Sequence, residues 1–298
     1  MSVEGRDHGL EATGERLVPE RQHGELVYAE HLARYRLAAQ LAPGRRVLDA
    51  ACGEGYGAAM LAAAGASSVV GVDLDGVVVE HVRRRHGIEA READVCDLPF
   101  ENGAFELVVS FETIEHVREP ERALAELARV CARDGLVVLS TPNAGQYLVE
   151  NEFHVREFAH DEFVAMLEGC FPSVRLLYQH NWLTSAVLDE EAMLEAGGDH
   201  RVEVGLTKVR AVRPGEELYL VAVCGEEVDV ALDPVAVLAG VDEAHALAKR
   251  LVDAEATARQ WHDAYLDIRE TARWMRSTMS WRLTKPLRLP ARLRGKRR

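Results

Sequence analysis

The sequence has 298 residues, a formal net charge of −14 and 48% hydrophobic residues. This length allows one large domain with an appendage, and the acidic balance argues against nucleic-acid binding by the body of the protein. The polar start is unlike a signal peptide, and no apolar run is long enough to span a bilayer. Five scattered cysteines without a CxxC pair predict reduced thiols in the cytoplasm.

Strand and helix patterns alternate along most of the chain. After a flexible segment at 1–24, a helix is expected over 26–41, ending before Pro43-Gly44. The pattern then predicts strands at 46–49, 68–73, 88–93, 106–111, 136–140, 174–179 and 217–224, and helices after Gly57 and at 76–85, 120–132 and 160–167. This alternation predicts a doubly wound α/β domain over 25–228 with a Rossmann-like, mostly parallel sheet, interrupted by an insertion at 181–214.

The chain changes character after Gly240. Apolar or small residues follow in alternating steps of four and three, which is a heptad pattern typical of a coiled coil or a long amphipathic helix over 241–285. Two arrangements stay open, a homodimer through this helix and packing of the helix on its own domain. The pattern comprises Leu247, Leu251, Ala254, Ala258, Trp261, Tyr265, Ile268, Ala272, Met275 and Met279.

The end of the chain is strongly basic. Residues 271–298 contain ten Lys and Arg and no Asp or Glu, and subtracting these ten charges leaves −24 on the rest. Such polarity indicates contact with something anionic. A basic tail at 286–298, with tryptophan and leucine interleaved before and within it, could lie on an anionic membrane surface. The alternative is a solvated tail that only balances the acidic body.

The stretch RVLDAACGEGYG, from Arg46 to Gly57, combines a buried strand, a glycine-rich turn and the start of a helix. This order brings backbone N–H groups and a helix N-terminus to one point. Acidic residues end the next strands, at Asp73 and Asp94, and the fourth strand runs from Ser110 into ETIEH. Because the carboxyl ends of parallel strands share one edge, these residues should converge on one crevice.

These motifs together resemble the class I S-adenosylmethionine (SAM)-dependent methyltransferases, particularly a subfamily of bacterial polysaccharide and glycoside biosynthesis. The resemblance covers roughly the first 180 residues and implies a seven-stranded sheet whose last strand is antiparallel. Ala51 replaces the usual first glycine of the family's loop, and its Cβ narrows the allowed backbone geometry. The matching runs are TGERLVPE, EHLARY, VLDAACGEGYG, VVGVDLD, LPFENGAFELVVSFETIEHV, LSTPN and FHVREF.

The resemblance implies a role for each position of the cofactor site. Asp49 would reach toward the methionine amino group, Asp73 would bind the ribose hydroxyls, and Asp94 would bind the adenine amino group. Tyr35 or Arg34 would hold the methionine carboxylate. The full set of expected SAM-binding residues is Tyr35, Asp49, Ala51, Gly53, Gly55, Asp73, Leu74, Asp94, Val95 and Ser110.

The catalytic residues expected are Glu112, Glu115 and His116, which form the run ExxEH. His116 could act as a general base, since the pKa of histidine lies near neutrality. With His154, the three could instead hold Mg²⁺ or Mn²⁺. That arrangement resembles the plant small-RNA 2′-O-methyltransferases and some quinone-pathway O-methyltransferases, where a metal grips the acceptor. The alternative is that the glutamates cap a turn and His154 packs a loop.

The function expected is therefore O-methylation of a sugar or glycoside hydroxyl. The enzyme would be cytoplasmic, with peripheral contact to the inner membrane face or to a glycosyltransferase through its C-terminal helix and tail. Two alternative functions are a non-catalytic cofactor-binding scaffold of a glycan assembly complex and an NAD-dependent oxidoreductase. The GxGxG loop disfavours the oxidoreductase, which would carry GxGxxG. The sequence assigns no role to His81, His86, His180 or His245.

Overall fold

The computed structural model describes residues 17–22, 25–147, 151, 153–194, 202, 205–239 and 242–277. The chain divides into two units, residues 1–239 and 240–298. Residues 1–16 of the expected flexible segment, residues 278–285 at the end of the expected heptad helix, and the basic tail at 286–298 lie outside the described residues. The expected membrane and glycosyltransferase contacts of that tail therefore stay predictions.

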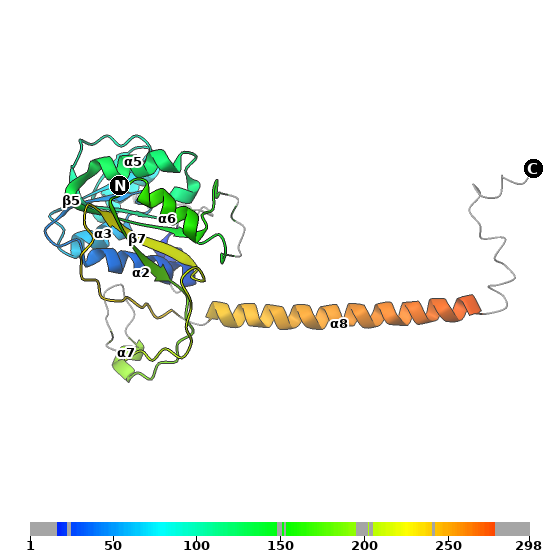
Figure 1. Ribbon diagram of the computed structural model, residues 1–298. Coiled ribbons are helices and arrows are strands. Elements are labelled where there is room, and N and C mark those ends of the chain that lie inside the picture. The colour runs from blue at the N-terminus through cyan, green and yellow to red at the C-terminus, as the bar shows by residue number, and fades with distance from the viewer. Residues whose placement is uncertain are drawn as a thin grey trace, which may run out of the picture. The chain divides into compact units, whose positions relative to one another are not determined.

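The first unit is built on a seven-stranded sheet with the strand order β3-β2-β1-β4-β5-β7-β6 (Figure 1). Neighbouring strands from β3 to β5 are parallel, whereas β7 runs antiparallel to both β5 and β6. This confirms the predicted Rossmann-like sheet with an antiparallel last strand. The strands are β1 Arg46–Ala50, β2 Ser68–Asp73, β3 Glu89–Glu92, β4 Phe105–Phe111, β5 Cys131–Pro142, β6 Ser173–Gln179 and β7 Tyr219–Gly225.

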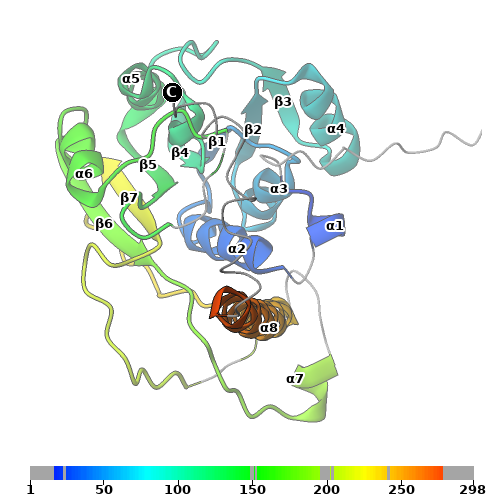
Figure 2. The ribbon, with the colours of Figure 1, turned by 90° about the vertical axis from the view of Figure 1, so that its right-hand side faces the viewer.

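Helices cover both faces of this sheet (Figure 2). One face packs against apolar residues of α2 and α3, and the other packs against α5 and α6. The central strands β1 and β4 are buried on both faces, which explains why most of their residues are apolar. The helices of this unit are α1 Pro19–Gln22, α2 Leu26–Ala39, α3 Tyr56–Ala63, α4 Gly76–His86, α5 Pro120–Val130, α6 His160–Glu168 and α7 Glu190–Leu194, with a 3₁₀ turn at Ile114–His116.

Two segments differ from the sequence-based expectation. The segment expected to be flexible up to residue 24 contains Leu17 and Val18, which are buried, and the short helix α1. Val18 packs with valines of α4, so burial of apolar surface holds this segment. Helix α5 ends at Val130 rather than 132, because Cys131 already has extended backbone angles and begins β5.

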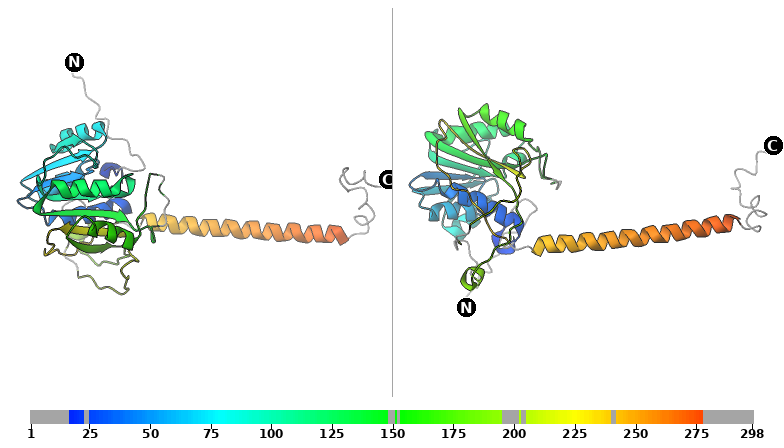
Figure 3. Two further views of the ribbon diagram at one scale, coloured as in Figure 1. Left: turned by 45° about the horizontal axis from the view of Figure 1, so that its top comes forward. Right: turned by 60° about the horizontal axis from the view of Figure 1, so that its bottom comes forward.

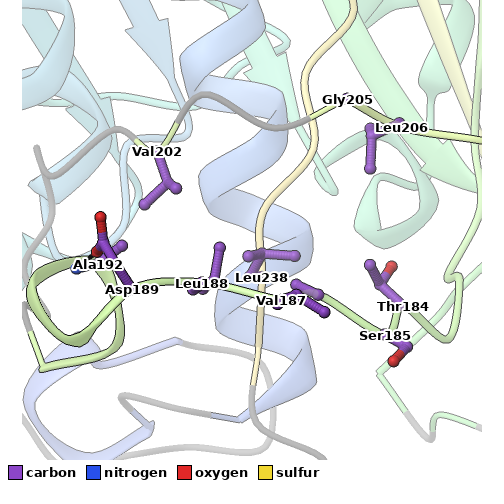
Figure 4. A pocket seen from close by; sticks show the side chains of 11 residues that line it. Thr184, Ser185, Val187, Leu188, Asp189, Ala192, Val202, Gly205, Leu206 and Leu238 are labelled. Carbon is purple, nitrogen blue, oxygen red and sulfur yellow. Dashed lines mark hydrogen bonds between the residues drawn. The ribbon is translucent and has the colours of Figure 1, made fainter.

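The connection between β6 and β7 contains the expected insertion. Its described residues form no strand, and α7 is the helix within them. The connection lines a hollow of about 360 Å³ together with Leu238, and Val187 and Leu188 project toward it (Figure 4). Asp189, the one charged residue of its lining, accepts a hydrogen bond from the Ala192 N–H within α7, so the hollow offers little chemistry.

The second unit contains α8, Asp242–Ser277, a single uninterrupted helix of 36 residues (Figure 3). The heptad residues of its described part are largely exposed, with Leu251, Trp261 and Ile268 each more than half accessible to solvent. No helix in the described part of the chain is long and apolar enough to cross a membrane.

Candidate active site

Asp49 lies at the centre of the candidate site, near the carboxyl end of β1, and is fully buried. The Tyr35 hydroxyl of α2 donates to its two carboxylate oxygens at 3.1 and 3.2 Å. Burial raises the pKa of Asp49 to about 8, the Tyr35 hydrogen bond opposes the rise, and the Asp73 charge adds to it. Asp49 therefore holds a proton at neutral pH until a cationic group approaches.

The glycine loop after β1 has the backbone that its sequence requires. Gly53 and Gly55 have φ of 51° and 94°, a left-handed conformation that glycine adopts without steric cost. A Cβ on Gly53 would meet no atom within 4 Å, so the loop faces open space there. Ala51 is accommodated without a positive φ, and its N–H points to the Thr113 hydroxyl at 3.4 Å.

Asp73 links this loop to the next helix. Its carboxylate accepts hydrogen bonds from the Gly53 N–H at 3.1 Å and the Asp75 N–H at 3.0 Å. Asp75 in turn caps α4 by accepting from the Val77 N–H. Leu74 lies between Asp73 and Asp75 in the sequence, and its side chain is 72% exposed. An apolar side chain is therefore accessible next to Asp73, the residue expected to bind the ribose.

The adenine end of the expected site follows β3. The Ala93 N–H donates to the Asp73 carbonyl at 3.0 Å, which brings this segment beside β2. Asp94 is exposed and accepts from the Cys96 N–H at 2.8 Å, and Val95 is half-buried. Ser110 differs from the other expected cofactor residues, because it is buried within β4.

Glu112 and Glu115 follow β4 but point to different partners. Glu112 has a φ of 49°, a conformation that is uncommon outside glycine, and accepts from the Ser140 hydroxyl at 2.6 Å. The Arg34 guanidinium lies 3.9 Å from the same carboxylate oxygen. Glu112 is therefore not part of the histidine cluster that Glu115 joins.

The structure brings Glu115, His116 and His154 together, with one potential ligand atom of each within 4.8 Å of the others. Glu115 is buried and accepts from the Thr141 hydroxyl at 3.1 Å, but its Oε1 has no hydrogen-bond partner among the described residues. Burial raises the pKa of Glu115 well above its ordinary value, and the charge of Glu112 adds to the rise. An unpartnered carboxylate oxygen beside two imidazoles fits a cation.

The hydrogen bonds of the two imidazoles indicate their tautomers. The Phe153 carbonyl lies 3.1 Å from His116 Nδ1, so Nδ1 carries a proton, and Nε2 lies 4.0 Å from a carboxylate oxygen of Glu115. His154 Nε2 lies 3.0 Å from the Asn151 amide nitrogen, and its Nδ1 lies 3.4 Å from Glu157. Binding a metal at His154 would displace one of these two partners.

A second polar cluster lies on α2. The sequence patterns predict a role for one of its members, Arg34, and none for Glu30. Arg34 is buried, donates to the Gln179 side chain at 2.8 Å and stacks 4.7 Å over the Tyr219 ring. Its Nε and Nη2 have no partners among the described residues. Glu30, one turn before Arg34, accepts from the Tyr219 hydroxyl at 2.7 Å. The available signal was the i, i+4 spacing of Glu30 and Arg34 on one helix face.

A substitution at Gly57 would test how tightly α3 packs against Tyr35. A Cβ on Gly57 would lie 2.0 Å from the Tyr35 ring, so Gly57→Ala should push the ring off Asp49. We expect the free energy of unfolding, measured by urea denaturation, to fall by about 2 kcal/mol, because overpacking outweighs the gain in helix propensity. The control Gly205→Ala meets no atom within 4 Å and should change stability by less than about 0.5 kcal/mol. Equal stability of the two variants would contradict this geometry.

Comparisons with known proteins indicate the family of the chain. Residues 48–139 match the family model described as a methyltransferase domain. A probable SAM-dependent methyltransferase of Mycobacterium tuberculosis (strain ATCC 25618 / H37Rv) is 31% identical over 244 residues, which span 76% of this chain and 89% of the relative. A second probable SAM-dependent methyltransferase, from Mycolicibacterium smegmatis, is 31% identical over 247 residues, which span 76% of this chain and 94% of the relative.

The fold comparison adds a solved structure. A SAM-dependent methyltransferase of Thermotoga maritima superimposes with a TM-score of 0.50 at 21% identity, over 72% of this chain and 97% of that one. At this identity the likeness concerns the fold, whereas the mycobacterial relatives match most of their length in sequence. The chain therefore belongs to the SAM-dependent methyltransferases.

Proposed function

We propose that this enzyme transfers the methyl group of SAM to a hydroxyl of a sugar or glycoside, with a divalent metal held by Glu115, His116 and His154. The observation that carries the proposal is the buried, unpartnered Oε1 of Glu115 facing two imidazoles at the carboxyl end of β4. This position lies beside the cofactor loop, since the Ala51 N–H of the loop points to the Thr113 hydroxyl.

SAM, when bound, supplies an electrophilic methyl group on its sulfonium. Asp49 would accept from its amino group, Gly53 and Gly55 would allow close approach of the backbone, and Asp73 would accept from the ribose hydroxyls. Asp94 and Val95 would contact the adenine, with Leu74 beside the ribose. The buried donors of Arg34 favour this residue over Tyr35 for the methionine carboxylate, because the Tyr35 hydroxyl is already engaged with Asp49.

The acceptor hydroxyl has to be positioned and to lose its proton. A divalent metal on the Glu115 cluster would lower the pKa of a coordinated hydroxyl, and a vicinal diol would provide two such oxygens. Without a metal, His116 would act as the general base for the acceptor hydroxyl. A sugar acceptor suits both routes, and the metal route selects for neighbouring hydroxyls.

A screen for methyl transfer tests this proposal. Nucleotide sugars, lipid-linked sugars and glycosylated small molecules would be incubated with SAM, with and without Mg²⁺ or Mn²⁺, and release of S-adenosylhomocysteine measured. We expect turnover on acceptors with a vicinal diol and weaker turnover on matched deoxy sugars. Turnover confined to carboxylates or amines would contradict the acceptor class, and SAM binding without turnover on any acceptor would favour a scaffold.

We also propose that α8 pairs with α8 of a second copy. Its exposed heptad residues would be buried in a two-stranded coiled coil. Ile268→Glu should convert a dimer to a monomer in light-scattering chromatography, because it places a charge in the seam. Val252→Glu, exposed on the same helix but outside the heptad positions, is the control and should stay dimeric. A wild-type protein that is monomeric at high concentration would instead favour packing on its own domain.

A further inference from the structure

A second cluster of metal-binding groups lies behind the cofactor loop and takes no part in the proposed reaction. Glu54 stands in the loop between Gly53 and Gly55, and His81 and His86 come from α4. His81 Nε2 lies 2.8 Å from Glu54 Oε1, and His86 Nε2 lies 3.1 and 3.2 Å from the two oxygens. One atom of each residue therefore meets the others within 4.8 Å.

The cluster is largely shielded from solvent. Glu54 is 5% and His81 is 7% exposed, whereas His86 is half-buried and leaves a route from solvent. A Cβ on Gly55 would lie 2.8 Å from Val82 and 3.1 Å from His86, so the loop is pressed against α4 at this point. Burial acts to raise the pKa of the Glu54 carboxyl, but hydrogen bonds with His86 and His81 outweigh it and lower the pKa.

We infer that Glu54, His81 and His86 form a binding site for a zinc ion that fastens the cofactor loop to α4. Two imidazole nitrogens and one carboxylate are a donor set that zinc accepts in tetrahedral sites, with water as a fourth ligand. Ligands of tetrahedral zinc stand about 3.3 Å apart, given bonds of about 2.0–2.1 Å. The two contacts of Glu54 Oε1, 2.8 Å to His81 and 3.1 Å to His86, need to lengthen by only a few tenths of an ångström. The two imidazole nitrogens, which stand within 4.8 Å of each other, have to come to about the same spacing.

Zinc at this position would act on the cofactor site through the backbone. The loop residue before Glu54 donates its N–H to Asp73, and α4 begins at the cap formed by Asp75. Fixing Glu54 to α4 thus restrains both segments that hold the ribose end of the site. An ion that binds the folded chain and not the unfolded chain also stabilises it, by RT ln(1 + [ion]/Kd). Zinc should therefore raise the melting temperature and tighten SAM binding.

His86→Gln separates ligation from hydrogen bonding, because a glutamine amide can still donate to Glu54 but is a poor zinc ligand. Metal-stripped protein would be titrated with Zn²⁺ against a chromophoric chelator, and with Co²⁺ to record the absorption bands of a tetrahedral site. His81→Gln is the second variant, and His262→Gln, exposed on α8, is the control. Circular dichroism and melting in EDTA verify that each variant folds.

We expect His86→Gln to weaken zinc binding about 100-fold or more, since loss of a direct ligand should exceed the 10- to 100-fold typical of an outer-shell partner. The His154→Ala variant keeps this zinc site, which separates it from the metal proposed for the reaction. Equal zinc affinity and stoichiometry in wild type and His86→Gln would overturn the inference. Loss of zinc binding in His154→Ala alone, with binding kept in His86→Gln and His81→Gln, would also overturn the inference.

Discussion

Replacing Asp49 with asparagine should weaken SAM binding by roughly 30-fold to more than 1,000-fold. The proposed partner of this buried carboxylate is the methionine ammonium group, and truncating one partner of a buried charge pair costs about 2–5 kcal/mol. Asparagine keeps the size of the side chain and can still accept from Tyr35, so the fold should survive. Isothermal titration calorimetry measures the change.

The matched control for this substitution is Asp97→Asn. Asp97 is exposed and lies on the same side of the sheet, after β3, and it has no place in the proposed cofactor site. Its variant should bind SAM as the wild type does. An Asp49→Asn protein with wild-type affinity would show that the methionine amino group binds elsewhere.

The pH dependence of binding follows from the same residue. Asp49 has a pKa of about 8 in the free enzyme, and an α-amino group has a pKa of about 7.7–8.0, so both carry protons at pH 6.5. The ion pair in the complex holds only one proton, and binding should therefore release about one. SAM affinity should rise from pH 6 to about pH 8, and Asp49→Asn should remove this rise.

The stability of the free enzyme should respond in the opposite direction. The pKa of Asp49 is raised by folding, from about 3.9 in the unfolded chain to about 8. Between these values the folded state binds more protons than the unfolded state. The contribution of Asp49 to the free energy of unfolding therefore falls as the pH rises from about 4 to about 8.

Removing the metal proposed for the Glu115 cluster should lower kcat by about 100-fold or more. The loss would remove several kcal/mol of charge stabilisation on the acceptor oxygen. EDTA should produce this loss in the wild type, and Mg²⁺ or Mn²⁺ should restore activity. His154→Ala should show the same loss without metal rescue, while its dissociation constant for SAM stays unchanged.

Two controls accompany this measurement. Glu115→Gln should match His154→Ala, whereas Glu119→Gln, an exposed carboxylate just after the cluster, should keep full activity. His262→Ala provides the equivalent control for the histidine. Full activity of the wild type after chelation would exclude the metal route and leave His116 as the base.

The sequence was sufficient to predict the sheet and the placement of Asp49 and Asp73 at one edge of it. Buried parallel strands have continuous apolar sequences, so Val47-Leu48 and the strand before Asp73 are distinctive. Once the strands are assigned, parallel pairing alone places Asp49 and Asp73 at one edge. Local patterns therefore determine these positions without any knowledge of side-chain contacts.

The remaining features depend on contacts that sequence patterns do not encode. The spacing of ExxEH places both glutamates together, but the left-handed backbone at Glu112 turns its carboxylate toward Ser140. The pairing of Glu30 with Tyr219 joins residues 189 positions apart. Likewise, Glu54 appears as an ordinary loop residue until the fold brings α4 against it.

The position of β7 has a consequence for how such an enzyme could change its acceptor. Since β7 is antiparallel to both neighbours, β6 ends at the same edge as β1, β2 and β4. The connection that follows therefore leaves the sheet at the edge of the proposed catalytic groups, where Gln179 contacts Arg34 and Asn181 contacts Glu30. Exchange of this connection between homologues would alter the surface offered to the acceptor and leave the SAM-binding half intact, so it is a natural unit for making chimeras.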